Sequence, residues 1–522
     1  MANLSEQQSN VRDWVLSGTG SLNLVARAGC GKTYTLIEGV VTPIVEYGLG
    51  TVSLMAYNKK AAEEFQIRLD KKRNEGHDFS GVETGTVHSF GMKIISRNAR
   101  GRRPKVFAGK TVIIAKEFAE QDEEVSSPEE SIYFTERFVI KKLVSHAKQK
   151  AIGYKYDIHE FSIWQELVDR FNVNGISNPQ RITMEDIIKC SMKVLEESFN
   201  RDKELIDFDD MILAPLVHGM KVFKKDWVLI DEAQDTNDAR RELALLMLSP
   251  NGRLVAVGDD RQAIYGFTGA DADSMDKIAK KMESVSLPLT TTYRCPKSVV
   301  LEANKIVPDL IAHESAPEGK VMAIDERKTT EPWYKTMSVG KGDAILCRNT
   351  GPLVSLTYTF LANGIPCKIE GTDIGSGLIE VISKWKKAKS IPDMMVLFRE
   401  YIDKEMEKAV TSNKHYRMDQ LSDLSGAIEA IARGVIDSGG NQVKEMVHWI
   451  KKYFVDTEGE VPAVLLSTIH KSKGREWDRV FLYQRAKRLP SPYAKQPWQL
   501  EQESNLEYVA ITRAKDILVF VD

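Results

Sequence analysis

Paired cysteines, a long apolar run and an excess of charge of one sign are all missing from this sequence of 522 residues. Its five cysteines contain no C-x-x-C pair, so neither a zinc site nor an iron–sulfur cluster is signalled, and a reducing compartment fits best. No apolar run approaches the roughly 18 residues of a membrane span, and the first residues do not resemble a signal peptide. We therefore expect no membrane association, and a place in the cytosol or on a chromosome.

Basic and acidic residues nearly cancel, because 72 lysines and arginines stand against 74 aspartates and glutamates. The formal net charge of -2 means that any contact with nucleic acid must come from a local groove. A hydrophobic content of 42% with 28% charged residues is the balance of a soluble globular protein. The length predicts roughly three or four domains.

A glycine-rich stretch, Ala28-Gly29-Cys30-Gly31-Lys32-Thr33, separates an apolar run at 22–26 from the start of a predicted helix. Gly29 and Gly31 allow backbone N–H groups to turn toward phosphate oxygens, and Lys32 is expected to reach the β- and γ-phosphates. Thr33 is expected to place its hydroxyl on Mg²⁺. Ala26 replaces the usual first glycine, and the alternative is a glycine-rich turn with an incidental Lys-Thr pair. The strand and helix signals on either side favour a phosphate-binding loop (P-loop).

A second apolar run, residues 227–230, ends in the adjacent carboxylates Asp231 and Glu232. Such a pattern predicts a buried strand of a parallel sheet. The two carboxylates would then lie at the carboxyl end of the strand, which is the edge of the sheet where ligands bind. Asp231 is the expected Mg²⁺ partner, and Glu232 can orient and deprotonate an attacking water. A further strand leads to Gln262, which could sense a γ-phosphate five residues before the aromatic Phe267.

Other predicted strand ends carry Tyr57 and His88, although a packed core histidine is as common as a functional one. Core packing is likewise an open alternative for the aromatic rings of Tyr57 and Phe267. From about residue 97 to 201 the pattern changes to charged helices with a strongly acidic run at 121–130, which reads as an inserted helical subdomain with a solvated acidic surface.

These residues resemble the motifs of the UvrD/Rep/PcrA-type helicases of superfamily one. The resemblance continues through the later motifs at 293–296, 344–349, 464–481 and 503–514, so that eight motifs in the family's order span residues 4 to 514. It implies an α/β fold of two RecA-like P-loop NTPase domains with parallel sheets flanked by helices, each interrupted by a mainly helical insertion. The first domain would comprise 1–96 and 202–290 around the insertion 97–201, and the second 291–374 and 457–522 around a small insertion 375–456.

The resemblance also implies roles for single residues, with ATP and Mg²⁺ as the bound groups. The catalytic set would be Lys32, Asp231, Glu232, Gln262, Arg294 and Arg513, the two arginines approaching the γ-phosphate. Thr33 and Asp231 would hold the metal. The nucleotide would be bound by the adenine contacts Gln8 and Tyr293, the ribose contact Glu476, and the loop residues Ala28, Gly29, Cys30, Gly31, Lys32, Thr33 and Tyr34. The single strand would be lined by Tyr57, His88, Tyr265, Phe267, Arg348, Thr468 and His470, because aromatic stacking grips any base.

The sequence departs from the family in several places. Phe267 stands where the family usually has tryptophan, which gives a smaller stacking platform, and Asn505 stands where arginine is common. The second insertion is much shorter than in relatives. The sequence ends directly after the last predicted strand, so we expect none of the family's C-terminal extensions, such as nuclease domains.

The resemblance implies an ATP-dependent DNA helicase or translocase that moves 3′ to 5′ on single-stranded DNA and unwinds duplex in repair, recombination or replication. Expected partners are single-stranded DNA and single-strand/duplex junctions, with single-strand-binding or recombination proteins as candidates, and the motor is expected to act as a monomer. It would be DNA-associated in the cytoplasm of a bacterium or phage-infected cell, or in a eukaryotic nucleus. One alternative is a translocase or motor subunit that displaces bound proteins and unwinds weakly. Another is a nucleotide-gated DNA-binding protein without productive turnover.

Overall fold

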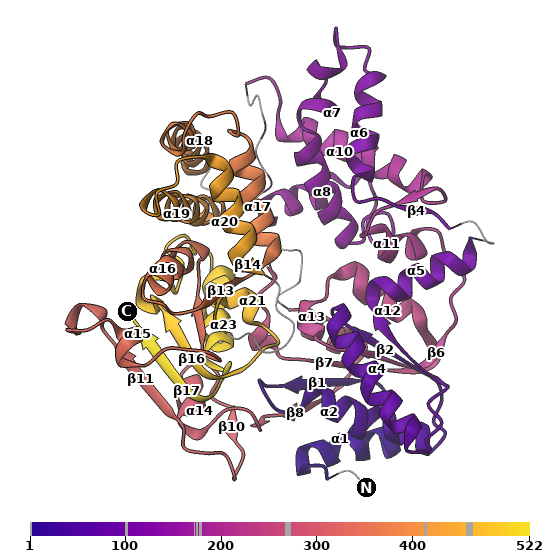
Figure 1. Cartoon of the computed structure of the whole chain (residues 1–522). Helices are drawn as coiled ribbons and strands as arrows, with labels where there is room; N and C mark the ends of the chain where they lie inside the picture. The colour runs from indigo at the N-terminus through magenta and orange to yellow at the C-terminus, as the bar shows by residue number, and fades with distance from the viewer. Residues whose placement is uncertain are drawn as a thin grey trace. The chain divides into compact units, whose positions relative to one another are not determined.

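The chain folds into two compact units in a computed structural model (Figure 1), one formed by Met1–Ala26 and Gly31–Leu289 and the other by Arg27–Cys30 and Thr290–Asp522. The structure describes residues 3–99, 103–171, 173, 176, 180–266, 273–411, 415–455 and 463–522, with the backbone alone at 415, 416 and 455. None of the helices in these ranges combines the length and the apolar character needed to cross a membrane.

The first unit is built on a six-stranded sheet in which every paired neighbour runs parallel. Its four central strands carry most of the buried apolar residues, as expected for a parallel sheet covered on both faces, and its two edge strands are partly exposed. From one edge to the other they are β3 (Val82–Thr86), β2 (Val52–Ala56), β6 (Lys225–Ile230), β7 (Leu248–Gly258), β1 (Leu22–Ala26) and β8 (Val285–Leu289).

Several helices of this unit begin at polar caps. Ser5 and Gln8 form a capping box at α1 (Glu6–Ser17), and Asn58 and Thr86 accept backbone N–H groups at the starts of α4 (Lys59–Asn74) and α5 (Val87–Asn98). One continuous helix follows β1 as α2 (Lys32–Tyr34), the π-helical η1 (Thr35–Val41) and α3 (Thr42–Glu46). Two further helices of this unit, α12 (Asp238–Met247) and α13 (Ser274–Lys281), follow β6 in the chain.

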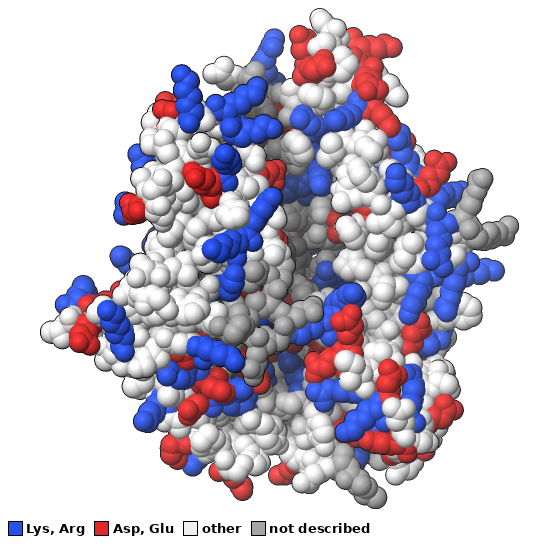
Figure 2. Space-filling model, in the orientation of Figure 1, with Lys and Arg blue, Asp and Glu red and all other residues white. Residues whose placement is uncertain are grey.

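A helical segment between β3 and β6 belongs to the same unit. It contains the short pair β4 (Lys105–Val106) and β5 (Leu205–Ile206), in which the start and the end of the segment lie side by side. Its helices are α6 (Lys110–Glu120), α7 (Ile132–Thr135), α8 (Arg137–Gln149), α9 (Phe161–Phe171), α10 (Met184–Asn200) and α11 (Asp210–Val217). Figure 2 shows acidic side chains gathered at the tip near α6 and α7, and both signs of charge elsewhere on this face.

Two lysines of this segment are completely buried. The Lys110 ammonium donates to Asp202 at 2.6 Å and to Asp210 at 2.8 Å, and Lys148 donates to Asp207 at 2.7 Å and lies 2.6 Å from the other oxygen of Asp210. Burial alone would lower the pKa of Lys148, but Asp210 and Asp207 outweigh it and raise that pKa. This buried lysine–aspartate network joins α6 and α8 to the chain that returns toward β6.

The second unit is built on a seven-stranded sheet, again with parallel neighbours. In spatial order the strands are β11 (Lys320–Ile324), β17 (Ala514–Val521), β16 (Trp477–Tyr483), β12 (Ala344–Cys347), β15 (Val464–Thr468), β13 (Cys367–Glu370) and β14 (Phe454–Val455). A separate short pair joins β9 (Thr291–Thr292) to β10 (Ile311–Ala312).

Helices of the second unit divide into those outside the segment between β13 and β14 and a group within that segment. The first group is α14 (Lys297–Ala303), α15 (Trp333–Thr336), α16 (Thr350–Ala362), α21 (Ile469–Ser472), α22 (Arg485–Arg488) and α23 (Pro497–Ile511). The second group is α17 (Thr372–Ser383), α18 (Ile391–Thr411), α19 (His415–Asp437) and α20 (Val443–Tyr453). Two parallel sheets flanked by helices confirm the predicted α/β fold class.

Candidate nucleotide and single-strand site

The glycine-rich loop connects β1 to the helix that begins at Lys32. Gly29 and Gly31 have φ values of 72° and 79°, the left-handed region that only glycine adopts readily. A Cβ on Gly29 would lie 2.5 Å from Thr292 Oγ1, and a Cβ on Gly31 would lie 3.2 Å from Gln8 Nε2. The loop therefore requires glycine at both positions, and the side chain of Gln8 lies next to it.

Gln8 is held in place by its own helix. Its side-chain oxygen accepts the backbone N–H of Ser5 at 3.0 Å, its backbone N–H donates to the Ser5 hydroxyl at 3.3 Å, and only 4% of the residue is exposed. The capping box of α1 thus fixes the residue predicted to contact adenine.

Lys32 forms an ion pair with Glu232, with 2.7 Å between Nζ and Oε1. Burial alone would lower the pKa of Lys32, but the carboxylates of Glu232, Asp231 and Asp259 raise it above its ordinary value. Burial, and then repulsion from Glu232, raise the pKa of Asp231 to about 7 against the opposing charge of Lys32. The lysine of the loop is therefore a cation that faces the two carboxylates at the end of β6.

Glu232 has a φ of 50°, unusual for a residue with a side chain, in the turn that leads into η3 (Ala233–Asp235). This conformation directs the chain so that the Gln234 amide donates to the Glu232 carboxylate. Strain of this kind tends to persist at functional sites.

A chain of hydrogen bonds continues from Glu232 to Gln262. The Gln234 side-chain oxygen accepts the backbone N–H of Asp259 at 3.1 Å, and the Asp259 carboxylate accepts the Gln262 amide at 2.7 Å. Gln234, Asp259 and Gln262 are all buried. The structure thus links the P-loop lysine to Gln262 through Glu232, Gln234 and Asp259, a path that we call the polar relay.

The relay ends three residues before an aromatic cluster. Tyr57, after β2, and Tyr265 have nearly parallel rings with centroids 6.1 Å apart, and the guanidinium of Arg240 lies 5.3 Å from the Tyr57 ring. Burial, together with the charge of Arg240, lowers the pKa of His88 to about 4, so this imidazole is neutral at physiological pH. Tyr57, Arg240 and Tyr265 line a cavity of about 360 Å³ with residues of α8 and η3.

The second unit holds both predicted arginines close to Glu476. The Arg294 guanidinium donates to the Glu476 carboxylate and, at 3.5 Å, to the carbonyl of Thr512. Arg513 is 1% exposed and donates to the carbonyls of Val509 at 2.9 Å and Arg475 at 3.0 Å. Burial, and then the neighbouring Arg294, lower the pKa of Arg513 to about 10.

Tyr293, the residue predicted to stack on adenine, is 48% exposed beside His313, with 4.8 Å between ring centroids. The turn Arg27–Cys30 of the loop belongs to this second unit. The backbone N–H of Ala28 donates to the buried Tyr508 hydroxyl at 3.0 Å, and Arg27 pairs with Asp309 at 2.9 Å. Phe267 lies outside the described residues.

Arg348, Thr468 and His470 lie near one another at one end of the second sheet. Arg348 forms a two-pronged ion pair with Glu503, at 2.8 Å and 3.1 Å, and a further pair with Asp419 at 3.0 Å. Burial, and then the charges of Arg348 and Lys473, lower the pKa of His470 to about 3. Thr468 caps α21 by accepting the N–H of Lys471. The predicted contact of Arg348 with a single strand would therefore compete with two carboxylates.

Sequence reasoning missed Gln234, Arg240 and Tyr508. Gln234 lies two residues after the predicted general base, and Arg240 lies six residues further along, so proximity along the chain is a usable signal for both. Tyr508 lies 480 residues from its partner Ala28 and has no such signal.

The residues at the P-loop fit a triphosphate bound with Mg²⁺. Such a complex needs N–H donors and a cation for the phosphates, which the loop glycines and the helix that begins at Lys32 can supply. It also needs carboxylate oxygens for the metal side, and two carboxylates lie at the end of β6. Among the described residues no group of three or more histidine, cysteine or acidic side chains could hold a metal by itself. A cation that arrives with a nucleotide is held mainly by phosphates and by one or two protein oxygens, and Thr33 and Asp231 stay the predicted ones.

Comparison with known proteins agrees with this geometry. Residues 5–283 match the model of the UvrD/REP helicase N-terminal domain, which is more than half of the chain. The chain belongs to the UvrD/REP helicase family. Residues 463–521 match the UvrD-like helicase C-terminal domain, and the family resemblance predicted from the motifs is confirmed.

Individual relatives are distant in sequence. The chain is 23% identical to a probable DNA helicase of Mycoplasma pneumoniae over 516 residues, which is 95% of this chain and 79% of the relative. It is 24% identical to the ATP-dependent DNA helicase Rep of Buchnera aphidicola and 25% identical to the ATP-dependent DNA helicase PcrA of Staphylococcus aureus. Those matches cover 55% and 60% of this chain but only 42% and 41% of the relatives.

Proposed function

We propose that this protein is an ATP-driven motor that moves 3′ to 5′ along single-stranded DNA and separates duplex ahead of it. Family membership and relatives named as DNA helicases support the class of activity. The polar relay is the main structural support for the proposal, because it connects the lysine of the P-loop to the segment that bears Tyr265.

In the proposed mechanism Gly29, Gly31 and Lys32 hold the phosphates, while Thr33 and Asp231 hold Mg²⁺. The metal would neutralise phosphate charge. Glu232 would leave its ion pair with Lys32 once phosphates pair with the lysine, and would then orient a water molecule and accept its proton. Arg294 and Arg513 are the proposed arginines for the γ-phosphate, and Gln8, Tyr293 and Glu476 the proposed contacts of adenosine, with Ala28, Cys30 and Tyr34 completing the loop.

The change at Glu232 would reach the single strand through the relay. Gln234 and Asp259 bond directly to their neighbours, so release of Glu232 by Lys32 alters the partners of Gln234 and in turn the position of Gln262. Tyr57, His88 and Tyr265 are the proposed grip on the bases in the first unit. Arg348, Thr468 and His470 are proposed for the second, and Phe267 stays a prediction from the sequence.

Unwinding of tailed duplexes tests the proposal. We expect ATP hydrolysis that is stimulated by single-stranded DNA, and separation of duplexes with a 3′ tail but not of blunt duplexes or those with a 5′ tail. Lys32→Ala should abolish hydrolysis and unwinding. Unwinding from a 5′ tail alone would contradict the direction, and full DNA-stimulated hydrolysis by Lys32→Ala would contradict the site.

A second candidate is a translocase that strips proteins from single strands and unwinds weakly. The small helical group α17–α20, the segment predicted as a reduced second insertion, favours it. Displacement of a labelled single-strand-binding protein, measured beside strand separation, distinguishes the two. Rapid ATP-dependent displacement with duplex left intact selects this candidate. DNA binding that responds to nucleotide without any turnover selects the third alternative, a nucleotide-gated binding protein.

A further inference from the structure

A second cavity in the first unit, of about 440 Å³, lies between α12 and α13. Its apolar lining comes from β6, β7 and both helices, namely Ile230, Leu245, Leu254, Ile278 and Met282. None of its lining residues belongs to the P-loop, the polar relay or the aromatic cluster. The volume lies within the range of pockets that take small ligands or a few side chains.

The rest of the lining is strongly charged. Five cationic side chains, Lys155, Arg241, Lys277, Lys280 and Lys281, stand against two carboxylates, Asp238 and Glu242. An excess of positive charge around a low-dielectric wall attracts and orients an anionic ligand. The cavity therefore combines an apolar floor with a cationic rim.

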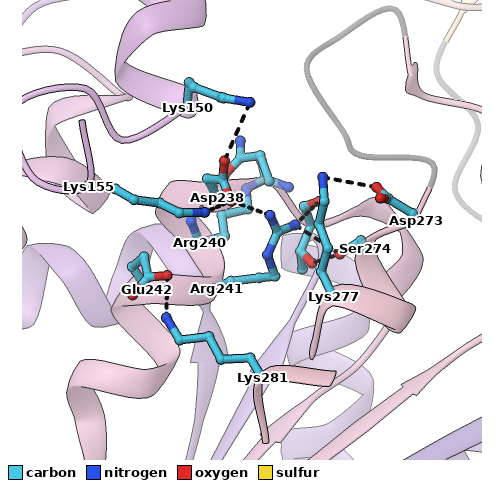
Figure 3. A network of polar contacts seen from close by, with 12 residues as sticks. Lys150, Lys155, Asp238, Arg240, Arg241, Glu242, Asp273, Ser274, Lys277 and Lys281 are labelled. Carbon is cyan, nitrogen blue, oxygen red and sulfur yellow. Dashed lines mark hydrogen bonds and ion pairs between the residues drawn. The ribbon is translucent and has the colours of Figure 1, made fainter. Parts of the chain in front are cut away.

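Ion pairs hold the rim in place, as Figure 3 shows. Asp238 pairs with Lys155 at 2.8 Å and with Arg241, and Arg241 also donates to the Ser274 hydroxyl at 3.2 Å. Lys281 pairs with Glu242 at 2.6 Å, and Lys277 pairs with Asp273, which does not line the cavity, at 2.9 Å. Because these bonds fix the side chains, a ligand would lose little further freedom on binding.

Helix α12 shows that this arrangement departs from ordinary core packing. Asp238, Arg241, Glu242 and Leu245 recur at the spacing of one helical face, the face that lines the cavity. Such a face is normally apolar where it packs on a sheet, yet Asp238, Arg241 and Glu242 are all less than 9% exposed. Replacing buried ion pairs by well-packed apolar residues is often neutral or stabilising, so folding alone does not require these charges.

We propose that this cavity binds an acidic peptide segment of a partner protein, with an apolar side chain on the floor and flanking carboxylates on the rim. Single-stranded nucleic acid fits less well, because bases are gripped by aromatic stacking and none of the residues that line the cavity is aromatic. The proposal is independent of the motor function, since it uses no residue of that site.

A binding experiment with synthetic peptides tests the proposal on the full chain. The probe is a short fluorescein-labelled peptide of aspartate and glutamate with two adjacent leucines, and binding is followed by fluorescence anisotropy. Two matched peptides carry lysine in place of the acids or serine in place of the leucines. We expect saturable binding of the first peptide only, weakened by salt as screening requires.

Variants locate the binding. Lys280→Glu should weaken it about threefold to tenfold, and Leu245→Trp, which fills the cavity, more than tenfold, with DNA-stimulated ATP hydrolysis unchanged as the check on folding. Lys71→Glu makes the same charge change on the exposed face of α4 and should leave binding intact. Equal binding by all three variants would overturn the proposal, as would displacement of the peptide by single-stranded or duplex oligonucleotides. Peptide-dependent dissociation of a dimer in sedimentation would identify a second copy of the chain as the occupant instead.

Discussion

Among the proposed catalytic residues, Glu232 has the side-chain contacts that define its role most narrowly. Its carboxylate has Lys32 on one side and Gln234 on the other, so it is both the proposed proton acceptor and the start of the relay. Glu232→Gln should reduce DNA-stimulated ATP hydrolysis by about 10²–10⁴-fold, the usual contribution of a general base. Binding of a fluorescent nucleotide analogue should be retained. Hydrolysis within a few fold of the unmodified protein would remove Glu232 from this role.

Gln234 gives a sharper test, because its proposed function is transmission. Gln234→Leu keeps a similar size but cannot bond to Glu232 or to Asp259. We expect hydrolysis without DNA to change less than about threefold, while the stimulation by single-stranded DNA falls about tenfold or more. Thr42→Val, a buried polar-to-apolar change in α3 away from the relay, serves as the matched control. Equal losses with and without DNA would indicate a structural role for Gln234 in place of coupling.

Sequence alone could predict which residue types meet at this site, because strand ends in a parallel sheet share one edge. The motifs single out both Lys32 and Glu232, which lie 200 residues apart, and the structure places the two side chains in contact. The side-chain bonds of Arg348 were not predictable, since its partners Asp419 and Glu503 come from helices whose packing no local pattern specifies. Partners of this kind depend on tertiary contacts.

At the scale of elements, the contact between α8 and α9 makes the helical segment sensitive to pH. His146 stacks on Phe171 with 4.0 Å between ring centroids, and Lys142 and Arg170 are the charged groups acting on it. Burial, and then these two cations, lower the pKa of His146 from 6.5 to about 4. The unfolded chain therefore binds this proton more readily, and stability that is complete above pH 6.5 is lost as the pH falls toward 4.

We expect this histidine to account for up to about 3 kcal/mol of acid destabilisation at pH 4. His146→Leu should flatten the decline in the melting temperature of the first unit between pH 6.5 and 4.5. His159→Gln changes an exposed histidine and should leave the slope unchanged. The same slope in His146→Leu and the unmodified protein would show that other groups govern the acid response.

The helical character of this segment followed from its charged helical pattern, whereas its buried lysine–aspartate network did not. Lysine and aspartate are usually solvated, so the sequence favours a surface for Lys110 and Lys148. Their burial depends on three aspartates that the chain supplies about 50 to 100 residues later. Periodicity predicts which elements form, but not which charges these elements enclose.

At the scale of the whole molecule, each unit has a sheet and a hydrophobic core of its own. Separate cores predict separate unfolding, so calorimetry should resolve two transitions instead of one. The residues proposed to contact the nucleotide are divided between the units: Gln8, Lys32 and Asp231 belong to the first, and Arg27–Cys30, Tyr293 and Arg294 belong to the second. A non-hydrolysable ATP analogue with Mg²⁺ should therefore raise both transitions.

The size of that rise follows from mass action, about 2.7 kcal/mol at a ligand concentration one hundred times the dissociation constant. Lys32→Ala should lose the rise in both transitions, since the lysine is the main charge offered to the phosphates. Tyr293→Ala should reduce the rise, because its exposed ring is the proposed platform for adenine. A rise confined to the first transition would mean that the nucleotide is bound by the first unit alone, and Arg294 and Tyr293 would then lose their proposed contacts with it.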